Sequence, residues 1–164
     1  HAAWAENGSG FVYSGAGGKS SPQGGTWTMT GVGTLCLQLM GAGSTGPAQT
    51  GLKVLKDRVL EWPRSGSQRP SVYGWYYVTQ VKFHAGQAQW NSWNPRFAIE
   101  LIGSQKSDGH WENGDYDNGT HVYTTSLCAL MLEVYYRYLP SYQVKAGNDP
   151  REAPPSQEIP VTVR

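Results

Sequence analysis

Residues 121–139 constrain the fold of this chain most strongly, because they form an uninterrupted helical run with almost no polar face. A helix that is apolar on nearly all sides is normally buried on all sides. The run is shorter than a membrane span and carries Glu133 and Arg137, so it is too short and too charged to cross a bilayer. We therefore expect it to lie inside a larger helical body, and we expect no membrane-spanning segment.

Four further helices are predicted before this run from their hydrophobic patterns. The helices predicted at 26–40 and 72–85 are apolar around most of their circumference. The helices predicted at 48–62 and about 90–101 each carry a single apolar face. Gly41 and Gly86 stand where glycine commonly ends a helix. Pro95 follows Asn94 in the fourth helix, which predicts a cap and a restart at that point.

Composition divides the 164 residues into three segments. Residues 1–25 are rich in Gly and Ser and are predicted to be a loop, 26–140 to be the helical domain, and the proline-rich 141–164 to be a tail or linker. The 13 basic and 12 acidic residues nearly balance, so charge gives no indication of nucleic-acid binding. Cys36 and Cys128 lie in apolar helical stretches, which predicts buried thiols and leaves the compartment open.

The order of the predicted helices is buried, amphipathic, buried, amphipathic, buried. Cys36, Val81 and Cys128 recur at nearly equal spacing when the three buried helices are aligned. Units of this size, each made of one buried and one surface helix, indicate stacked helical hairpins. The predicted fold is therefore all-α, with two layers of helices.

One loop carries a sequence signature. Gln105, Asp108, Gly109 and Trp111 match the Q-x-x-D-G-x-W pattern of the prenyltransferase and squalene-oxidase repeat family, and the chain resembles this family over about residues 7–140. The resemblance implies an α/α toroid of alternating inner and outer helices, as in terpenoid cyclases and protein prenyltransferase β-subunits. About five helices would make a partial toroid. In that family the Gln and Trp have a structural role, which would tie the fourth helix to the fifth.

The resemblance also implies two kinds of chemistry, and the residues fit neither well. Cyclases protonate their substrate through a D-x-D-D motif, to which Asp115 and Asp117 would correspond, but Asn118 replaces the last carboxylate. Protein prenyltransferases hold zinc through an Asp-x-Cys pair and a histidine; the chain has no Asp-x-Cys, and Thr124 aligns with the histidine. We therefore expect no cofactor and no catalytic residue, with Asp117, supported by Asp115, as the remaining candidate proton donor.

The acidic loop before the last helix is a second candidate site. Asn113, Asp115 and Asp117 offer oxygen ligands at alternate positions, as a calcium loop would. A solvated turn that complements the dipole of the next helix is the other interpretation. His110 and His121 are predicted to be loop or cap residues beside it.

The aromatic residues of the third helix are a third candidate. Tyr73, Trp75, Tyr76 and Tyr77 could line the central cavity of a toroid, where aromatic faces stabilise cations, or could fill the inner helical layer. Tyrosine hydroxyl groups would also suit a groove for a sugar or a peptide.

The sequence thus predicts a non-catalytic toroid-like repeat domain that binds or scaffolds within a larger bacterial protein. Its expected partner is another toroid half or the remaining domains of that protein, and the ligand is left open. Two alternatives stand beside this prediction: a cyclase-like enzyme acting on a polyprenyl substrate, and a carbohydrate-binding or carbohydrate-processing module.

Overall fold

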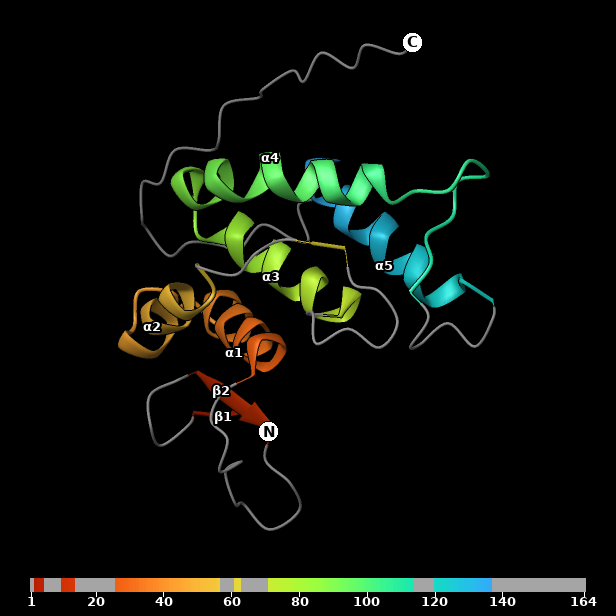
Figure 1. Ribbon diagram of the computed structural model, residues 1–164. Coiled ribbons are helices and arrows are strands. Elements are labelled where there is room, and N and C mark those ends of the chain that lie inside the picture. Colours follow the sequence, from red (N-terminus) through yellow and green to blue (C-terminus); the bar gives the residue numbers. More distant parts are fainter. Residues whose placement is uncertain are drawn as a thin grey trace.

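The computed structural model describes residues 2–4, 10–13, 26–56, 61–62, 71–113 and 120–136. These residues form two strands, five α-helices and one short 3-10 helix (Figure 1): β1 (Ala2–Trp4), β2 (Phe11–Tyr13), α1 (Trp27–Leu39), α2 (Gly46–Val54), α3 (Val72–His84), α4 (Gln87–Gly103), α5 (Val122–Leu132) and η1 (Glu133–Tyr136). The predicted all-α class is confirmed, apart from the short pair of strands.

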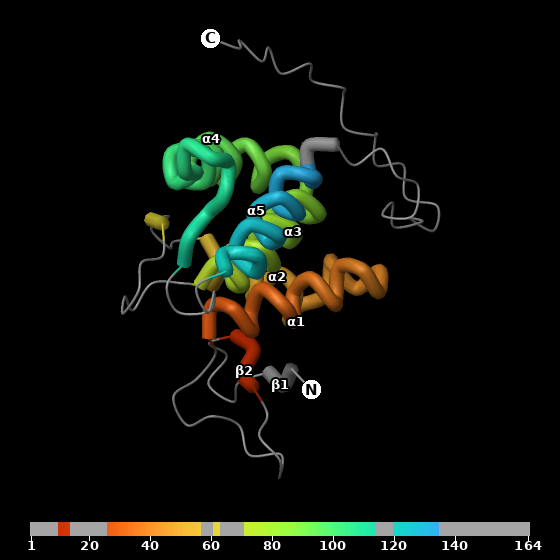
Figure 2. Tube along the Cα trace, turned by 90° about the vertical axis from the view of Figure 1, so that its right-hand side faces the viewer, coloured from red at the N-terminus to blue at the C-terminus, as the bar shows by residue number. Residues whose placement is uncertain are grey.

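The helices α1, α3 and α5 lie side by side in that order (Figures 1 and 2). The helix α2 packs against α1, and α4 packs against α3. The central helix α3 therefore has neighbours on three sides, which explains why residues from most of its circumference are buried. The core between the helices consists of apolar residues from α1 to α5, and its almost fully buried members include Trp75, Val78, Val81, Phe97, Leu101, Cys128 and Met131.

The ends of α1 show how local signals set the helix boundaries. The hydroxyl oxygen of Thr26 accepts a hydrogen bond from the backbone N–H of Met29, which caps the first turn. At the other end, Gly41 has a φ of +76°. Its N–H donates to the carbonyl of Gln38, and the next N–H donates to the carbonyl of Leu37. This pair of bonds is a Schellman motif, so the predicted end of the first helix is confirmed.

Buried polar side chains join the helices in addition to the apolar contacts. The indole N–H of Trp93 in α4 donates to the Thr79 hydroxyl of α3 over 3.3 Å, and that hydroxyl lies 3.9 Å from the Met131 sulfur of α5. The side-chain amide of Gln38 in α1 donates to the Val81 carbonyl of α3 over 3.2 Å. These bonds satisfy polar groups that would be expensive to bury alone.

The predicted restart of the fourth helix at Pro95 is wrong, because α4 runs through it. Proline in a helix interior costs about 3 kcal/mol. On either side of it, Trp93, Phe97 and Leu101 form one buried face. Burial of each such side chain contributes about 1.5–3 kcal/mol, so continuous packing against α3 outweighs the lost hydrogen bond.

The prediction that the last helix is buried on all sides is also wrong. In α5 one face is buried, through Thr124, Cys128 and Met131, while Val122 is 65% and Leu130 is 42% exposed. The physical reason is that α3 covers only one side of α5. The helix also ends earlier than predicted, at Leu132 before η1. Across the ranges given above, no helix has the length and hydropathy needed to cross a membrane.

Two more differences concern α1 and α2. The helix predicted at 48–62 is shorter, Gly46–Val54, and begins with Pro47 in its first turn. Trp62 lies beyond it, where its ring packs edge-on against Trp75 at 5.8 Å between centroids. Cys128 is buried as predicted, but Cys36 is exposed. The alignment of Cys36 with Val81 and Cys128 therefore does not reflect equal burial.

The prediction that residues 1–25 form a loop is wrong at residues 2–4 and 11–13, which form the strands β1 and β2. They pair antiparallel, with Ala3 opposite Val12. Phe11 and Val12 are buried, and the Phe11 N–H donates to the Thr30 hydroxyl of α1 over 3.1 Å. A Cβ atom on Gly33 of α1 would lie 2.4 Å from the Phe11 ring. The strand β2 is therefore seated directly on α1 at a position that only glycine permits.

Candidate functional site at the start of α5

The signature loop between α4 and α5 folds into a compact turn. The N–H of Lys106 donates to the His110 carbonyl and the N–H of Gly109 donates to the Lys106 carbonyl, each over 2.9 Å. The Gln105 side-chain amide donates to the Gly109 carbonyl over 2.8 Å. Gly109 has a φ of +93°, a conformation that glycine adopts without strain. The exposed Gln105 side chain thus shapes this turn, and its hydrogen bond does not reach α5.

Trp111 connects the two helices. Its ring is 4% exposed, and its indole N–H donates to the Leu101 carbonyl near the end of α4 over 2.7 Å. Its backbone N–H donates to the Thr125 hydroxyl in the first turn of α5 over 3.1 Å. Both neighbours of Trp111 in the chain, His110 and Glu112, are held in place by this anchor.

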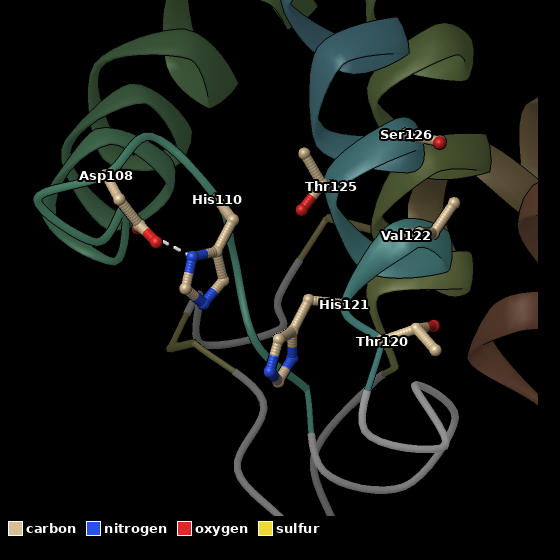
Figure 3. Close-up of a pocket in the computed structure, with 7 residues that line it drawn as sticks. All are labelled: Asp108, His110, Thr120, His121, Val122, Thr125 and Ser126. Carbon is tan, nitrogen blue, oxygen red and sulfur yellow. Dashed lines mark hydrogen bonds and ion pairs between the residues drawn. The ribbon is translucent and has the colours of Figure 1, made fainter.

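Two histidines meet beside the anchor (Figure 3). His110 comes from the loop, and His121 is the N-cap residue of α5. Their rings stack, with 4.7 Å between centroids and 24° between planes. His121 has a φ of +56°, a left-handed conformation that non-glycine residues seldom adopt. The prediction that His121 is a cap residue is confirmed.

Two carboxylates and one ammonium group surround these rings. Nδ1 of His110 lies 2.6 Å from Oδ1 of Asp108, and Nε2 of His110 lies 3.2 Å from Oε1 of Glu112. Nε2 of His121 is 4.0 Å from the same Glu112 oxygen. The other oxygen of Glu112, Oε2, lies 3.0 Å from the Lys106 ammonium. Glu112 is therefore shared between the lysine on one oxygen and the two histidines on the other.

These contacts shift the pKa values of three groups. The hydrogen bond to Glu112, and then that to Asp108, raise the pKa of His110 above its ordinary value. The hydrogen bond from Lys106, and then that from His110, lower the pKa of the Glu112 carboxyl. Desolvation acts to raise the pKa of Asp108, but the hydrogen bond and charge of His110 together outweigh it, so this pKa is lowered. The arrangement favours a protonated imidazole between two carboxylates.

An open depression lies over this cluster, with a cavity volume of about 450 Å³. It is lined from the loop and from the first turn of α5 by Asp108, His110, Thr120, His121, Val122, Thr125 and Ser126 (Figure 3). The imidazoles are therefore accessible to a small ligand or ion from solvent.

The other residues predicted to form a site are not all described by the structure. Asp115 and Asp117, candidates for proton donation and for calcium binding, fall outside the described residues. Asn113, the third calcium candidate, has a side chain that is 3% exposed, so it faces the protein interior. Within the described part of the loop, the groups that come together are His110, His121 and Glu112.

The aromatic residues of α3 divide between two surroundings. Trp75 is fully buried against Phe97 and Trp62, so it fills the core and does not line a cavity. Tyr73, Tyr76 and Tyr77 are partly exposed, with rings in edge contact at 4.8 and 5.1 Å. Burial, followed by the 3.2 Å hydrogen bond with Tyr73, raises the pKa of Tyr77 above its ordinary value.

Sequence reasoning placed His110 and His121 in the loop but did not bring them together. The His110-x-Glu112 spacing was the available local signal, since alternate residues of an extended segment point to the same side. His121 joins them only through the fold, because Trp111 fixes the loop against α5. Two imidazoles with carboxylates can hold a cation or exchange a proton. Comparison of the chain with models of known families, with curated proteins and with solved structures found no match.

Proposed function

We propose that this chain is a section of an α/α-toroid-type helical repeat, related to the prenyltransferase and squalene-oxidase repeat family, which acts by binding or scaffolding and not by catalysis. The observation that carries the proposal is the open face of α5, defined as Val122, Tyr123, Ser126, Ala129 and Leu130. These five residues are exposed, and none of them is charged.

The packing of α3 indicates what should cover that face. The helix α3 is contacted by α1 on one side and by α5 on the other, with α4 behind it. This arrangement repeats α1 with α2 behind it, as alternating inner and outer helices would. In stacked helical repeats each unit buries the apolar face of its neighbour. The open face of α5 is the position that the next inner helix of such an array would occupy.

The occupant that fits is therefore an apolar helix of a further repeat, from another toroid half or from the rest of a larger protein. A charged partner fits poorly, because the stretch from Val122 to Leu132 contains no charged side chain. Burying the surface of Val122 and Leu130 that is still exposed would contribute part of the roughly 1.5–3 kcal/mol that full burial of such a side chain provides. Those contacts would make the covered state the stable one.

The residues also favour binding over the reactions that the family resemblance implies. Thr124 stands where the zinc-binding histidine of a prenyltransferase would be, and its side chain is buried in the contact with α3. The acidic triplet of a cyclase is incomplete, since Asn118 replaces its last carboxylate. The Trp75 ring occupies the core, which removes one of the four aromatic side chains that could face a substrate.

Size-exclusion chromatography with light scattering tests this proposal. The chain alone should associate as its concentration rises and should bind a hydrophobic dye, because copies can cover one another's open face. Leu130→Glu should abolish both effects while leaving the far-UV circular dichroism unchanged. Ile99→Glu is the matched control, since Ile99 is 72% exposed on α4 and lies off the open face. A monomer that binds no dye, or equal effects of both variants, would contradict the proposal.

A further inference from the structure

We propose that His110, Glu112 and His121 form a binding site for a divalent transition-metal ion, with zinc as the ion that fits best. The three ligand residues lie outside the open face of α5, although Val122 and Ser126 of that face also line the depression beside them, and the proposal does not depend on the function of that face. Each of the three residues offers one ligand atom, and the three atoms all lie within 4.8 Å of one another. Two imidazole nitrogens and one carboxylate oxygen are ligands that zinc commonly takes from proteins.

The spacing of the ligand atoms suits a tetrahedral ion. With metal–ligand bonds of the usual length for zinc, neighbouring ligand atoms lie about 3.3 Å apart. Oε1 of Glu112 is 3.2 Å from Nε2 of His110 and 4.0 Å from Nε2 of His121. The ligand atoms lie up to 4.8 Å apart and the two imidazoles stack face to face, so both rings would have to rotate about their side-chain bonds to direct their nitrogens at one ion.

Asp108 and Lys106 select which ligand atoms face the ion. Asp108 engages Nδ1 of His110 at 2.6 Å, which leaves Nε2 as the nitrogen directed toward Glu112. A carboxylate behind a metal-binding imidazole is a common feature of zinc sites and raises the basicity of the ligand. Lys106 holds Oε2 of Glu112 at 3.0 Å and leaves Oε1 for the ion. Asp108 and Lys106 are thus positioning residues.

The three ligand residues are attached to well-packed parts of the protein. His110 and Glu112 flank Trp111, whose ring is buried and hydrogen-bonded to α4. His121 caps α5 itself. The charges of Asp108 and Glu112 offset the positive end of the α5 dipole, which would otherwise disfavour a cation there. An ion bound to these three residues would join the signature loop to the start of α5.

The depression above the cluster leaves the ion open to solvent. Three protein ligands occupy three of the four positions of a tetrahedral site, and a water molecule or another ligand would fill the fourth. Thr125 and Ser126 are among the residues that line the depression. Calcium and magnesium prefer sites built from oxygen atoms, so two imidazole ligands should exclude both.

Isothermal titration of the 164-residue chain with zinc chloride tests the site. The expected result is one ion bound per chain, with no measurable binding of calcium or magnesium. Glu112→Gln keeps the shape of the side chain but removes its charge, and His121→Gly removes a ligand while suiting the left-handed backbone. Each should weaken zinc binding at least tenfold, and Asp108→Asn should weaken it about 10–100-fold through lost orientation of His110.

The controls use the other two of the four histidines in the chain. His1→Ala and His84→Ala should leave the affinity unchanged, as should Leu130→Glu on the open face of α5. In the wild type, the ¹⁵N shifts of Nε2 in His110 and His121 should change on adding zinc, while circular dichroism confirms that each variant folds. Unchanged shifts, or equal zinc affinity in Glu112→Gln, His121→Gly and the wild type, would overturn the proposal.

Discussion

The two edges of the helix array, α1 and α5, differ in how they are covered. On α1, Gly31 faces Val78 of α3 while Gly33, on the other side, meets the Phe11 ring of β2. The outer side of α1 is therefore closed by the strand pair. On α5, the side away from α3 carries Val122 and Leu130 in exposed positions. The comparison shows that β2 covers part of the outer side of α1, whereas no described element covers the exposed residues of α5.

This difference also shows what an apolar helix in a sequence can and cannot reveal. Both α1 and α5 have apolar residues around most of their circumference, and both belong to the same row of helices. The strands β1 and β2 pack against α1, and the described part of the chain provides no equivalent beside α5.

Among the tests of the difference between α1 and α5, Phe11→Ala should have the largest effect on stability. Loss of a buried phenylalanine typically costs about 3–5 kcal/mol in the free energy of unfolding, and Phe11 is only 8% exposed. We expect a loss toward the lower end of this range, because the ring lies at an edge. Urea denaturation followed by circular dichroism measures it. A loss below about 1 kcal/mol, a typical value for an arbitrary substitution, would mean that β2 does not close α1.

Gly33→Ala should have a smaller effect of the same kind. Alanine gains about 0.5–1 kcal/mol over glycine in a helix interior. Its Cβ would lie 2.4 Å from the root of the Phe11 ring, and overpacking of this kind costs about 1–3 kcal/mol. The net change should therefore be destabilising. Gly46→Ala is the matched control, since no other side chain lies within 4 Å of the added atom. If both variants were more stable than the wild type, the Phe11 ring of β2 would not be tightly packed against α1.

Leu130→Ala should change the free energy of unfolding of the chain alone by less than about 0.5 kcal/mol, as surface substitutions usually do. Leu130 is 42% exposed on α5, whereas a buried leucine replaced by alanine loses about 2–5 kcal/mol. The same denaturation assay, performed at a concentration where the chain is monomeric, gives the value. A loss as large as that of Phe11→Ala would show that the open face of α5 is covered in solution.

The smallest effect concerns pH in the chelator-treated chain. Because the pKa of His110 is raised, its stabilising contribution is present below the ordinary histidine value of about 6.5 and is lost as the pH rises through the raised pKa. Because the pKa values of Asp108 and Glu112 are lowered, their contributions are present at neutral pH and are lost as the pH falls through those values. The cluster should therefore stabilise the start of α5 most in mildly acidic solution.

Nuclear magnetic resonance titration of the histidine ring protons checks this result. His110 should titrate above about 6.5. Asp108→Asn should move the pKa of His110 back toward the ordinary value. A pKa of His110 at or below the ordinary value would contradict the described contacts.

Features encoded by neighbouring residues could be predicted from the sequence. The helix around 26–40 and its end at Gly41 follow from periodicity and from a glycine in the right position, as does the helix at 72–85. The open face of α5 could not be predicted in this way, because hydrophobic periodicity records a preference for burial and not the presence of a neighbour. Pro95 likewise reads as a boundary until the buried face that spans it is known.

Only part of the candidate site could be predicted from the sequence. The signature residues Gln105 and Trp111 were recognised, but their pattern does not show that His121 returns to lie against His110. That contact depends on a hydrogen bond between Trp111 and Thr125, and hence on the relative placement of two separate segments. The strand pair was missed for the same reason, since the pairing of Ala3 with Val12 is not local.

The left-handed backbone conformation at position 121 favours glycine or asparagine, whereas the proposed metal site requires the histidine side chain. A left-handed residue other than glycine stores about 1–3 kcal/mol of strain, which glycine would release and asparagine would reduce. Laboratory evolution for heat resistance should therefore drift toward those two residues at 121. Selection for retention of an ion should instead keep histidine, so the outcome of such a selection would reveal which requirement matters more to the organism.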